Sequence, residues 1–172
     1  AKDCGPASLK MVAKYYGRYY SLQYLRDKCG ITKEGVSLLG ISVAAESIGF
    51  RTVAVKCTID DVMSKVPLPA IVYWEENHFI VVYDANKKYI YVSDPARGHL
   101  RYNKQEFQNG WCLKNEGQGV LLALEVTADF RQSKREREHE RNSFLSILRY
   151  FLPYRGQFAL VLFVMALATV LQ

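Results

Sequence analysis

The chain has 172 residues, of which 49% are hydrophobic and 13% aromatic, so it can form a folded core and disorder throughout is excluded. The net charge of +6 is unevenly spread: residues 1–130 carry 16 Lys and Arg against 14 Asp and Glu, and residues 131–172 carry 7 against 3. The basic excess lies in the tail, which argues against a nucleic-acid-binding domain, and we expect no nucleic-acid partner.

The cysteines give no sign of a metal site or a disulfide framework. They form no closely spaced pair and no Cys-x-x-Cys motif, so we expect free thiols, no metal and a reducing compartment. The four positions are Cys4, Cys29, Cys57 and Cys112.

The first fifty residues have helical apolar spacing and frequent stop signals. The spacing predicts helices over residues 4–16, 22–28 and 38–48. Asp3, Ser21 and Ser37 are suited to cap the three helices at their N-termini, and Gly30 is suited to end the second.

From residue 50 the apolar period changes from helical to strand-like. Alternating or continuous apolar runs predict strands over residues 51–57, 70–74, 78–84, 89–93 and 120–126. Short helices are expected over residues 58–66 and from Asn103, where Glu106 completes a capping box. The segment from Asp94 to Asn103 is expected to be a loop. Helices followed by an antiparallel meander indicate an α+β domain.

The chain is predicted to consist of three parts: a domain over residues 1–129, a charged linker over 130–142, and an amphipathic segment that leads into an apolar run over 143–172. The uncharged stretch from 158 to 171 is shorter than the roughly 20 residues that span a bilayer. We interpret it as the start of a transmembrane helix, with a buried or interfacial helix as the alternative.

Cys4 is the candidate nucleophile. A thiol attacks a carbonyl as its thiolate, and the backbone N–H groups and dipole at a helix N-terminus stabilise that anion. Cys4 begins the first predicted helix, and the small Gly5 would leave room for a substrate backbone. A buried structural thiol is the alternative, but a first turn flanked by Asp3 and Pro6 is a poor place to bury one.

His78 and Asp94 are the candidate general base and its orienting carboxylate. His78 starts one predicted strand and Asp94 follows the next, and in an antiparallel hairpin these two ends lie side by side. Pro95 would fix the direction of the carboxylate. An early Cys on a helix, followed by His and Asp on a sheet, is the papain-like order. Residues 74–77 would border the cleft.

The other candidates are weaker. His99 falls in a predicted loop and His139 in the charged linker, so both are interpreted as surface residues. Asp84 lies at the opposite end of the hairpin from His78. A polar residue at a strand edge is the alternative interpretation of His78 itself.

Three segments resemble the motifs of the C39 peptidases. Residues 3–11 (DCGPASLKM) resemble the cysteine motif, residues 78–82 (HFIVV) the histidine motif, and residues 92–95 (VSDP) the aspartate motif. The resemblance covers residues 1 to about 127. It implies a papain-like cysteine peptidase in which Cys4, His78 and Asp94 are catalytic and the backbone N–H of Cys4 binds the oxyanion.

The resemblance also implies a cellular setting. C39 domains form the N-terminal part of ABC exporters of bacteriocin-like peptides, where they face the cytosol and remove leaders after a double glycine. We therefore expect a double-glycine precursor as the substrate and a place at the bacterial inner membrane. The full protein would be a homodimer that uses ATP and Mg²⁺ in a part absent from this sequence. Residues 35–40 lack the end of a P-loop, so no cofactor is expected here.

One departure from the family pattern concerns the oxyanion hole. The family has a Gln a few residues before the Cys; this sequence begins three residues before Cys4, and neither Gln23 nor Gln108 matches that position. Losing such a donor costs roughly 10²–10³ in rate. A weak or inactive leader-binding module is thus the alternative function, and another papain-like hydrolase, such as an amidase or a transglutaminase-like enzyme, is a third. The residues of the substrate groove are not assigned.

Overall fold

The structure is a computed structural model that describes residues 3–30, 32, 35–112, 117–132, 156 and 165. The chain divides into two compact units, Ala1–Glu136 and Arg137–Gln172, and the fold described below is that of the first unit. The predicted linker beyond residue 132 and the predicted membrane segment lie outside the described residues, apart from two isolated positions. Within the part of the chain that is described, no helix is long and apolar enough to cross a membrane.

Three helices occupy the first fifty residues: α1 (Cys4–Tyr15), α2 (Leu22–Cys29) and α3 (Leu38–Ser47). The predicted caps of α2 and α3 are confirmed, because the hydroxyls of Ser21 and Ser37 each accept a hydrogen bond from a backbone N–H in the first turn. The prediction that the Asp3 side chain caps α1 is wrong. Its carboxylate instead pairs with Arg26 of α2 at 2.5 Å, which ties the start of α1 to α2.

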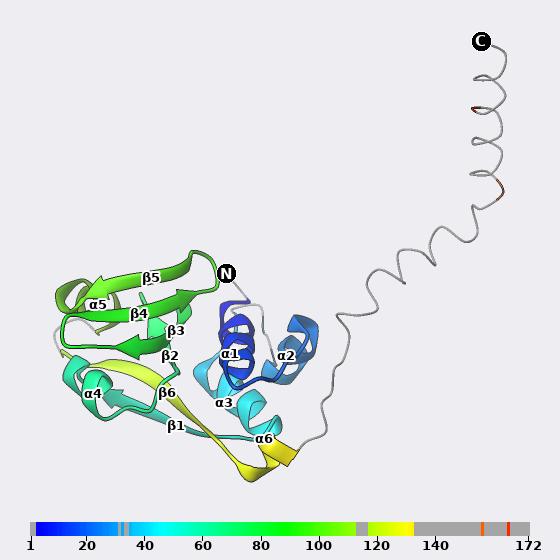
Figure 1. Ribbon diagram of the computed structural model, residues 1–172, viewed down its shortest axis with the longest axis horizontal. Coiled ribbons are helices and arrows are strands. Elements are labelled where there is room, and N and C mark those ends of the chain that lie inside the picture. Colours follow the sequence, from blue (N-terminus) through cyan, green and yellow to red (C-terminus); the bar gives the residue numbers. More distant parts are fainter. Residues whose placement is uncertain are drawn as a thin grey trace. The chain divides into compact units, whose positions relative to one another are not determined.

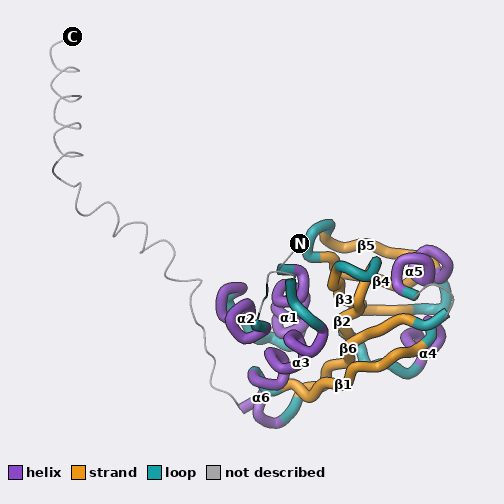
Figure 2. Tube along the Cα trace, turned by 180° about the vertical axis from the view of Figure 1, so that it is seen from behind, coloured by secondary structure: helices purple, strands orange, loops and turns teal. Residues whose placement is uncertain are grey.

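Six antiparallel strands form one sheet in the order β1-β6-β2-β3-β4-β5. The strands are β1 (Phe50–Cys57), β2 (Ala70–Trp74), β3 (His78–Ala85), β4 (Tyr89–Asp94), β5 (Gly98–Asn103) and β6 (Gly119–Val126). Figure 2 shows the strands side by side, from β5 at one edge of the sheet to β1 at the other. The prediction of a loop from Asp94 to Asn103 is wrong. This polar segment is the edge strand β5, and it is held by pairing with β4 along its whole length.

Helices cover the two faces of the sheet, so the domain has two cores and the predicted α+β class is confirmed (Figure 1). The helix-side core lies between α1–α3 and one face, and it includes Leu9, Val12, Ile41 and Phe79. The opposite core lies between the other face and the helices α4 (Ile59–Ser64) and α5 (Lys104–Trp111), and it includes Trp74, Ile80, Phe107 and Trp111. Successive residues of β3 alternate between the two cores, as a strand requires.

A short helix, α6 (Ala128–Gln132), crosses the predicted domain boundary at residue 129. Phe130 is buried beside Phe50, with ring centroids 4.4 Å apart, and its carbonyl accepts a hydrogen bond from Arg18 at 2.5 Å. Gly49 has a φ of 95°, and a side chain there would run into the backbone of Phe130. The helix-side core therefore includes residues beyond position 129.

Candidate active site

Cys4 is the first residue of α1, as the sequence predicted, and it is 7% exposed at the edge of the helix-side core. One turn later Ser8 is fully buried, and its hydroxyl donates a hydrogen bond to the carbonyl of Phe79 at 3.1 Å. Residues four apart lie on the same face of a helix. The contact therefore anchors the turn that carries Cys4 beside the start of β3, next to His78.

Sequence reasoning missed Ser8 as a positioning residue. The available signal was a hydroxyl within a helix whose neighbouring positions, Leu9 and Val12, are apolar and fully buried. A buried hydroxyl needs a hydrogen-bond partner. Only the fold shows that this partner is the backbone of β3.

Gly5 has a different role from the one predicted. We expected the missing side chain to leave room for a substrate backbone. A Cβ atom at this position would instead lie 2.4 Å from Val36 and 2.7 Å from Ile41. Gly5 is therefore required for close packing of α1 against α3.

His78 and Asp94 come together through the β3–β4 hairpin, as predicted. The register pairs Val81 with Ser93, which makes His78 a diagonal neighbour of Asp94. The imidazole Nε2 lies 2.8 Å from the carboxylate Oδ1. Both side chains are largely buried, at 16% and 4% exposure. Because Nε2 contacts Asp94, Nδ1 is the ring nitrogen left for proton transfer with a nucleophile.

A turn around Pro95 holds the carboxylate of Asp94. The backbone N–H of Ala96 donates to Oδ1 at 2.7 Å, so the same oxygen is bound by His78 and by the chain that leaves β4. Burial raises the pKa of Asp94, but the hydrogen bonds from His78 and Ala96 together lower it below its usual value. The ionised carboxylate can therefore orient the imidazole and stabilise its protonated form.

The turn before His78 has unusual backbone geometry. Glu75 and Glu76 have positive φ angles of 49° and 56°, and the N–H of Glu75 donates to the carbonyl of Gly110 in α5 at 2.8 Å. Two residues with positive φ match a tight hairpin turn. Of the segment expected to border the cleft, Trp74 is buried in the opposite core, whereas residues 75–77 are exposed.

The remaining candidates take other positions, although His99 is the cross-strand partner of Ser93, the residue before Asp94. Asp84 is exposed at the other end of β3, and His99 is exposed on β5 with its ring against Tyr83. Gln23 lies on α2 and Gln108 on α5, neither of them near the start of α1 in the sequence. The predicted surface residue His139 falls outside the described residues.

A cysteine at a helix N-terminus, beside a sheet whose hairpin carries a paired imidazole and carboxylate, defines the papain-like class of cysteine peptidases. A model of the Peptidase C39 family matches residues 1–122, and the chain belongs to this family. The expected family and fold are thereby confirmed.

Relatives and solved structures agree with this assignment. The lactococcin-G-processing and transport ATP-binding protein LagD of Lactococcus lactis is 34% identical over 86% of this chain and 21% of LagD. The transport/processing ATP-binding protein ComA of Streptococcus pneumoniae is 33% identical over 98% of this chain and 23% of ComA. The chain thus spans between a fifth and a quarter of the length of these relatives. A double-glycine-motif protease of an AMS/PCAT transporter, solved with the leader peptide, matches with a TM-score of 0.68 and 30% identity over 74% of this chain and 86% of its own.

Proposed function

We propose that this domain is a cysteine endopeptidase that removes double-glycine leaders from bacteriocin-like precursors. The observation that carries the proposal is the buried His78–Asp94 pair, 2.8 Å apart. Its strand is bound through Phe79 to the helix that begins with Cys4. The family membership and the relatives named as processing proteins support the reaction type. The relative solved with a leader peptide supports the substrate.

The geometry suggests the following steps. The thiolate of Cys4 attacks the carbonyl carbon of the second glycine, and its proton resides on His78. The backbone N–H of Cys4, at the start of α1, donates to the oxyanion. The C–N bond breaks as His78 protonates the departing amine, which leaves a thioester on Cys4. His78 then takes a proton from water, whose oxygen attacks the thioester, and the leader departs as a carboxylate. Asp94 holds the imidazole throughout.

The wider setting is part of the same proposal. The full protein would be an ABC exporter at the bacterial inner membrane, with this domain on the cytosolic side, a homodimeric assembly, and ATP and Mg²⁺ bound in its remaining part. The names of LagD and ComA, which combine transport, processing and ATP binding, support this setting. Membrane attachment would be through the segment that follows residue 142.

Replacing Cys4 by Ala tests the proposal. Cys4→Ala should abolish cleavage of a synthetic double-glycine precursor, measured by mass spectrometry, while the unfolding transition stays close to that of the parent. Cys57→Ala is the matched control, since Cys57 is a partly exposed thiol at the end of β1, and it should cleave normally. Undiminished cleavage by Cys4→Ala would overturn the proposal.

One observation favours a second candidate, a leader-binding module without catalysis. Cys4 is only 7% exposed, whereas a nucleophile must reach its substrate. The rate of alkylation by iodoacetamide at neutral pH separates the two functions. A peptidase should show fast modification of Cys4, whereas a binding module should show modification no faster than that of Cys57 or Cys112.

A further inference from the structure

The turn between β2 and β3 decides where His78 lies, because His78 is the first residue of the strand that follows it. Within the hairpin, the hydroxyl of Tyr73 donates a hydrogen bond to the carbonyl of Glu76. Another hydrogen bond comes from outside the hairpin: the N–H of Glu75 donates to the carbonyl of Gly110 at 2.8 Å. The end of α5 is thus bound directly to the turn that precedes His78.

The conformation of this turn depends on such contacts. The positive φ angles of Glu75 and Glu76 are rare for residues with a side chain, and they persist only where the surrounding structure holds them. The hydrogen bond to Gly110 holds the first of the two residues. Without it the turn can relax, and the relaxation would move His78, which follows Glu76 by two residues.

Trp74 gives α5 a second connection to His78. It is the last residue of β2, and the strand register places it directly opposite His78. Directly opposite residues of an antiparallel pair have Cβ atoms about 4.5–5.5 Å apart, so the indole is a near neighbour of the imidazole. The Trp74 side chain is buried, with its ring centroid 5.1 Å from that of Tyr102 and 5.3 Å from that of Phe107. A ring packed this closely passes a displacement on to its neighbours.

Gly110 lies where α5 touches this ring. In the last turn of a helix, glycine is less favourable than alanine, so its presence needs a reason. A Cβ atom at Gly110 would run into the six-membered ring of the Trp74 indole, 2.5 Å from Cη2. The absence of a side chain therefore lets α5 approach closely enough to bind Glu75. Because the backbone of Gly110 is helical, alanine would be opposed by the ring and not by its own φ angle.

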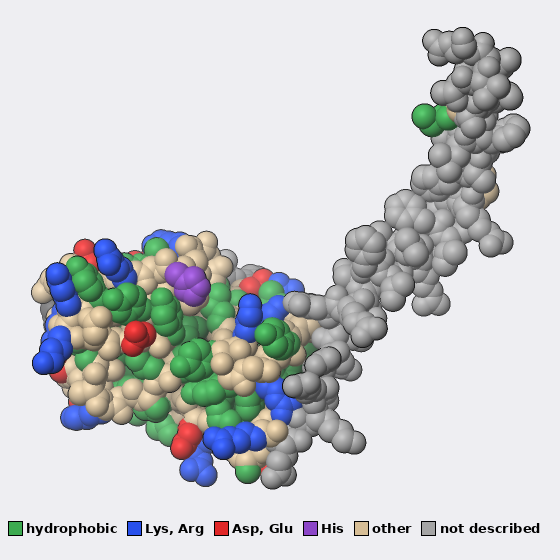
Figure 3. Space-filling view, viewed as in Figure 1, with side chains coloured by type: hydrophobic (Ala, Val, Ile, Leu, Met, Phe, Trp, Pro, Cys, Tyr) green, Lys and Arg blue, Asp and Glu red, His purple; other side chains and the backbone are tan. Residues whose placement is uncertain are grey.

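Helix α5 is itself firmly held, so it can serve as a support. Phe107 and Trp111 are buried in the opposite core, and the indole N–H of Trp111 donates to the carbonyl of Val120 at 2.9 Å. Basic side chains gather at the end of the domain that carries α4 and α5 (Figure 3). The helix thus keeps its polar residues in solvent and its apolar residues on the sheet.

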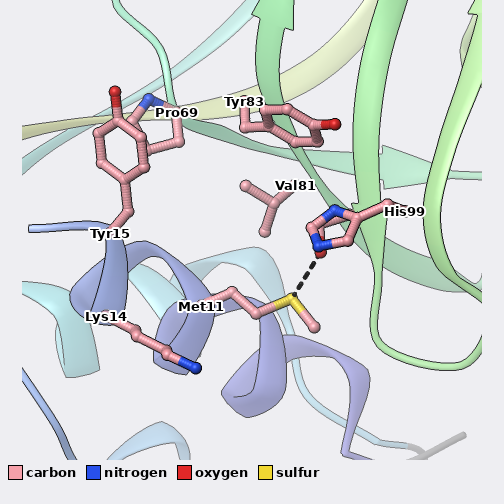
Figure 4. Close-up of a pocket in the computed structure, with 8 residues that line it drawn as sticks. Met11, Lys14, Tyr15, Pro69, Val81, Tyr83 and His99 are labelled. Atoms are coloured by element: carbon pink, nitrogen blue, oxygen red, sulfur yellow. Dashed lines mark hydrogen bonds between the residues drawn. The ribbon is translucent and has the colours of Figure 1, made fainter.

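The other face of β3 is held by α1. Figure 4 shows Val81 and Tyr83 of β3 across from Met11 of α1, around a pocket of about 470 Å³. These side chains lie three or more residues beyond His78. The start of β3 is therefore bound on two sides, to α1 through Ser8 and to α5 through the turn.

We propose that Gly110 is a positioning residue for the cleavage reaction: it lets the end of α5 bind the turn and Trp74, and thereby fixes the imidazole of His78. The inference rests on the proposed function, in which His78 transfers a proton. A displacement of about 1 Å in a reacting group can cost about 10²-fold in rate. Because the contact orients a base and does not bind the peptide, it acts on kcat and leaves KM nearly unchanged.

Gly110→Ala tests this role through the steady-state kinetics of a double-glycine peptide. The added methyl group pushes the Trp74 ring, so kcat per folded molecule should fall about tenfold to hundredfold, while KM stays within about twofold. Adding Trp74→Phe should restore most of kcat, because phenylalanine lacks the indole atoms that the methyl group meets. Phe107→Ala, by contrast, would neither push the ring nor remove the hydrogen bond to Glu75.

Gly49→Ala is the matched control. A Cβ atom there would lie 2.6 Å from the backbone of Phe130, beside β1, which β6 and β2 separate from β3. This variant should lose stability but keep the kcat of the folded protein. An unchanged kcat in folded Gly110→Ala would overturn the inference, and so would an equal loss in Gly49→Ala. If Gly110→Ala does not fold, Trp74→Leu removes the ring without adding volume, and a parental kcat there would overturn it.

Proton exchange gives a readout that needs no cleavage. In the inert Cys4→Ala protein, hydrogen bonds protect the amide N–H of Glu75 and the ring N–H of His78. Adding Gly110→Ala should speed the exchange of both about tenfold in NMR spectra, because both bonds open more often. Adding Gly49→Ala should leave the ratio of these rates to those of neighbouring β3 amides unchanged.

The two proposals can fail separately. If the parent cleaves the peptide but Gly110→Ala changes neither kcat nor proton exchange, the positioning role is wrong and the peptidase function stands. If proton exchange changes as expected but the parent cleaves no double-glycine peptide, the peptidase function is wrong and the support of His78 by α5 stands.

Discussion

The helix-side core and the opposite core lie on two faces of one sheet but differ in chemistry. The helix-side core contains Cys4 and the fully buried hydroxyl of Ser8, and a pocket lined by Met11 and Val81 opens beside it. The opposite core consists of apolar side chains around Phe107 and Trp111. The difference indicates that the helix-side core positions the candidate nucleophile, whereas the opposite core mainly supplies free energy of folding. Each prediction below either breaks or sharpens that division.

The largest expected effect is the loss of proton transfer in His78→Gln. Glutamine keeps a hydrogen-bond donor near Asp94 but cannot act as a base, so kcat/KM for a double-glycine peptide should fall about 10²–10⁴-fold. The urea unfolding midpoint should change little. Activity close to that of the parent would remove His78 from the mechanism.

Phe107→Ala addresses the opposite core. Phe107 is fully buried, and its removal should lower the free energy of unfolding by about 3–5 kcal/mol, measured by urea denaturation. The kcat per folded molecule should stay at the parent value. Leu39→Ala, at a side chain that is 73% exposed, is the control and should change stability by less than about 0.5 kcal/mol. A reduced kcat in folded Phe107→Ala would show that the two cores do not act separately.

Ser8→Ala should affect both stability and activity, because Ser8 joins α1 to the start of β3. Losing the buried hydrogen bond to Phe79 should lower the free energy of unfolding by about 1–3 kcal/mol. Cleavage should also slow, since the thiol and the imidazole sit on the two joined elements. Ser64→Ala removes an exposed hydrogen bond to the Asp60 carbonyl and serves as the control. An unchanged cleavage rate would mean that this contact only stabilises the fold.

The smallest effect concerns acid stability and Asp94. The pKa of Asp94 is lowered in the folded state. Its ionised form therefore stabilises the fold at any pH above the unfolded-state pKa of about 4. This contribution is lost as the pH falls through the folded-state pKa. The unfolding free energy of the parent should therefore fall more steeply with acid than that of Asp94→Asn. Hydrogen bonds from Lys65 and Thr58 lower the pKa of Asp61 to about 2. Because Asp61 is present in both proteins, its acid sensitivity cancels in this comparison. If the unfolding free energies of the parent and of Asp94→Asn fell in parallel with pH, the stabilising role of ionised Asp94 would be contradicted.

Local sequence was sufficient for most elements and for the candidate residues. The capping box of Asn103 and Glu106 appears in the structure as predicted, and so do the bounds of β2 and the start of β3. These features depend on neighbours in the chain, such as caps, turns and apolar period. The joining of His78 and Asp94 was also predictable, because two consecutive strands form a hairpin.

Features that depend on distant segments were predicted poorly. Residues 98–103 alternate without a strongly apolar face, and only pairing with β4 makes them a strand. Asp3 is a good cap by residue type, yet Arg26 from another helix takes its carboxylate. Gly5 was expected to leave room for a substrate, but the side chains of Val36 and Ile41 fill that space. In each case a partner from elsewhere in the chain decided the outcome.

By itself, the sequence determined the order of most elements, the three candidate residues and the family, since these follow from local pattern and motif. The tertiary structure alone decided how α1 meets β3 through Ser8, which glycine serves packing, and where a pocket lined by Met11 and Val81 forms. The physical reason is that hydrogen bonds and close packing between distant segments depend on atomic positions, which a local pattern of residue types does not specify.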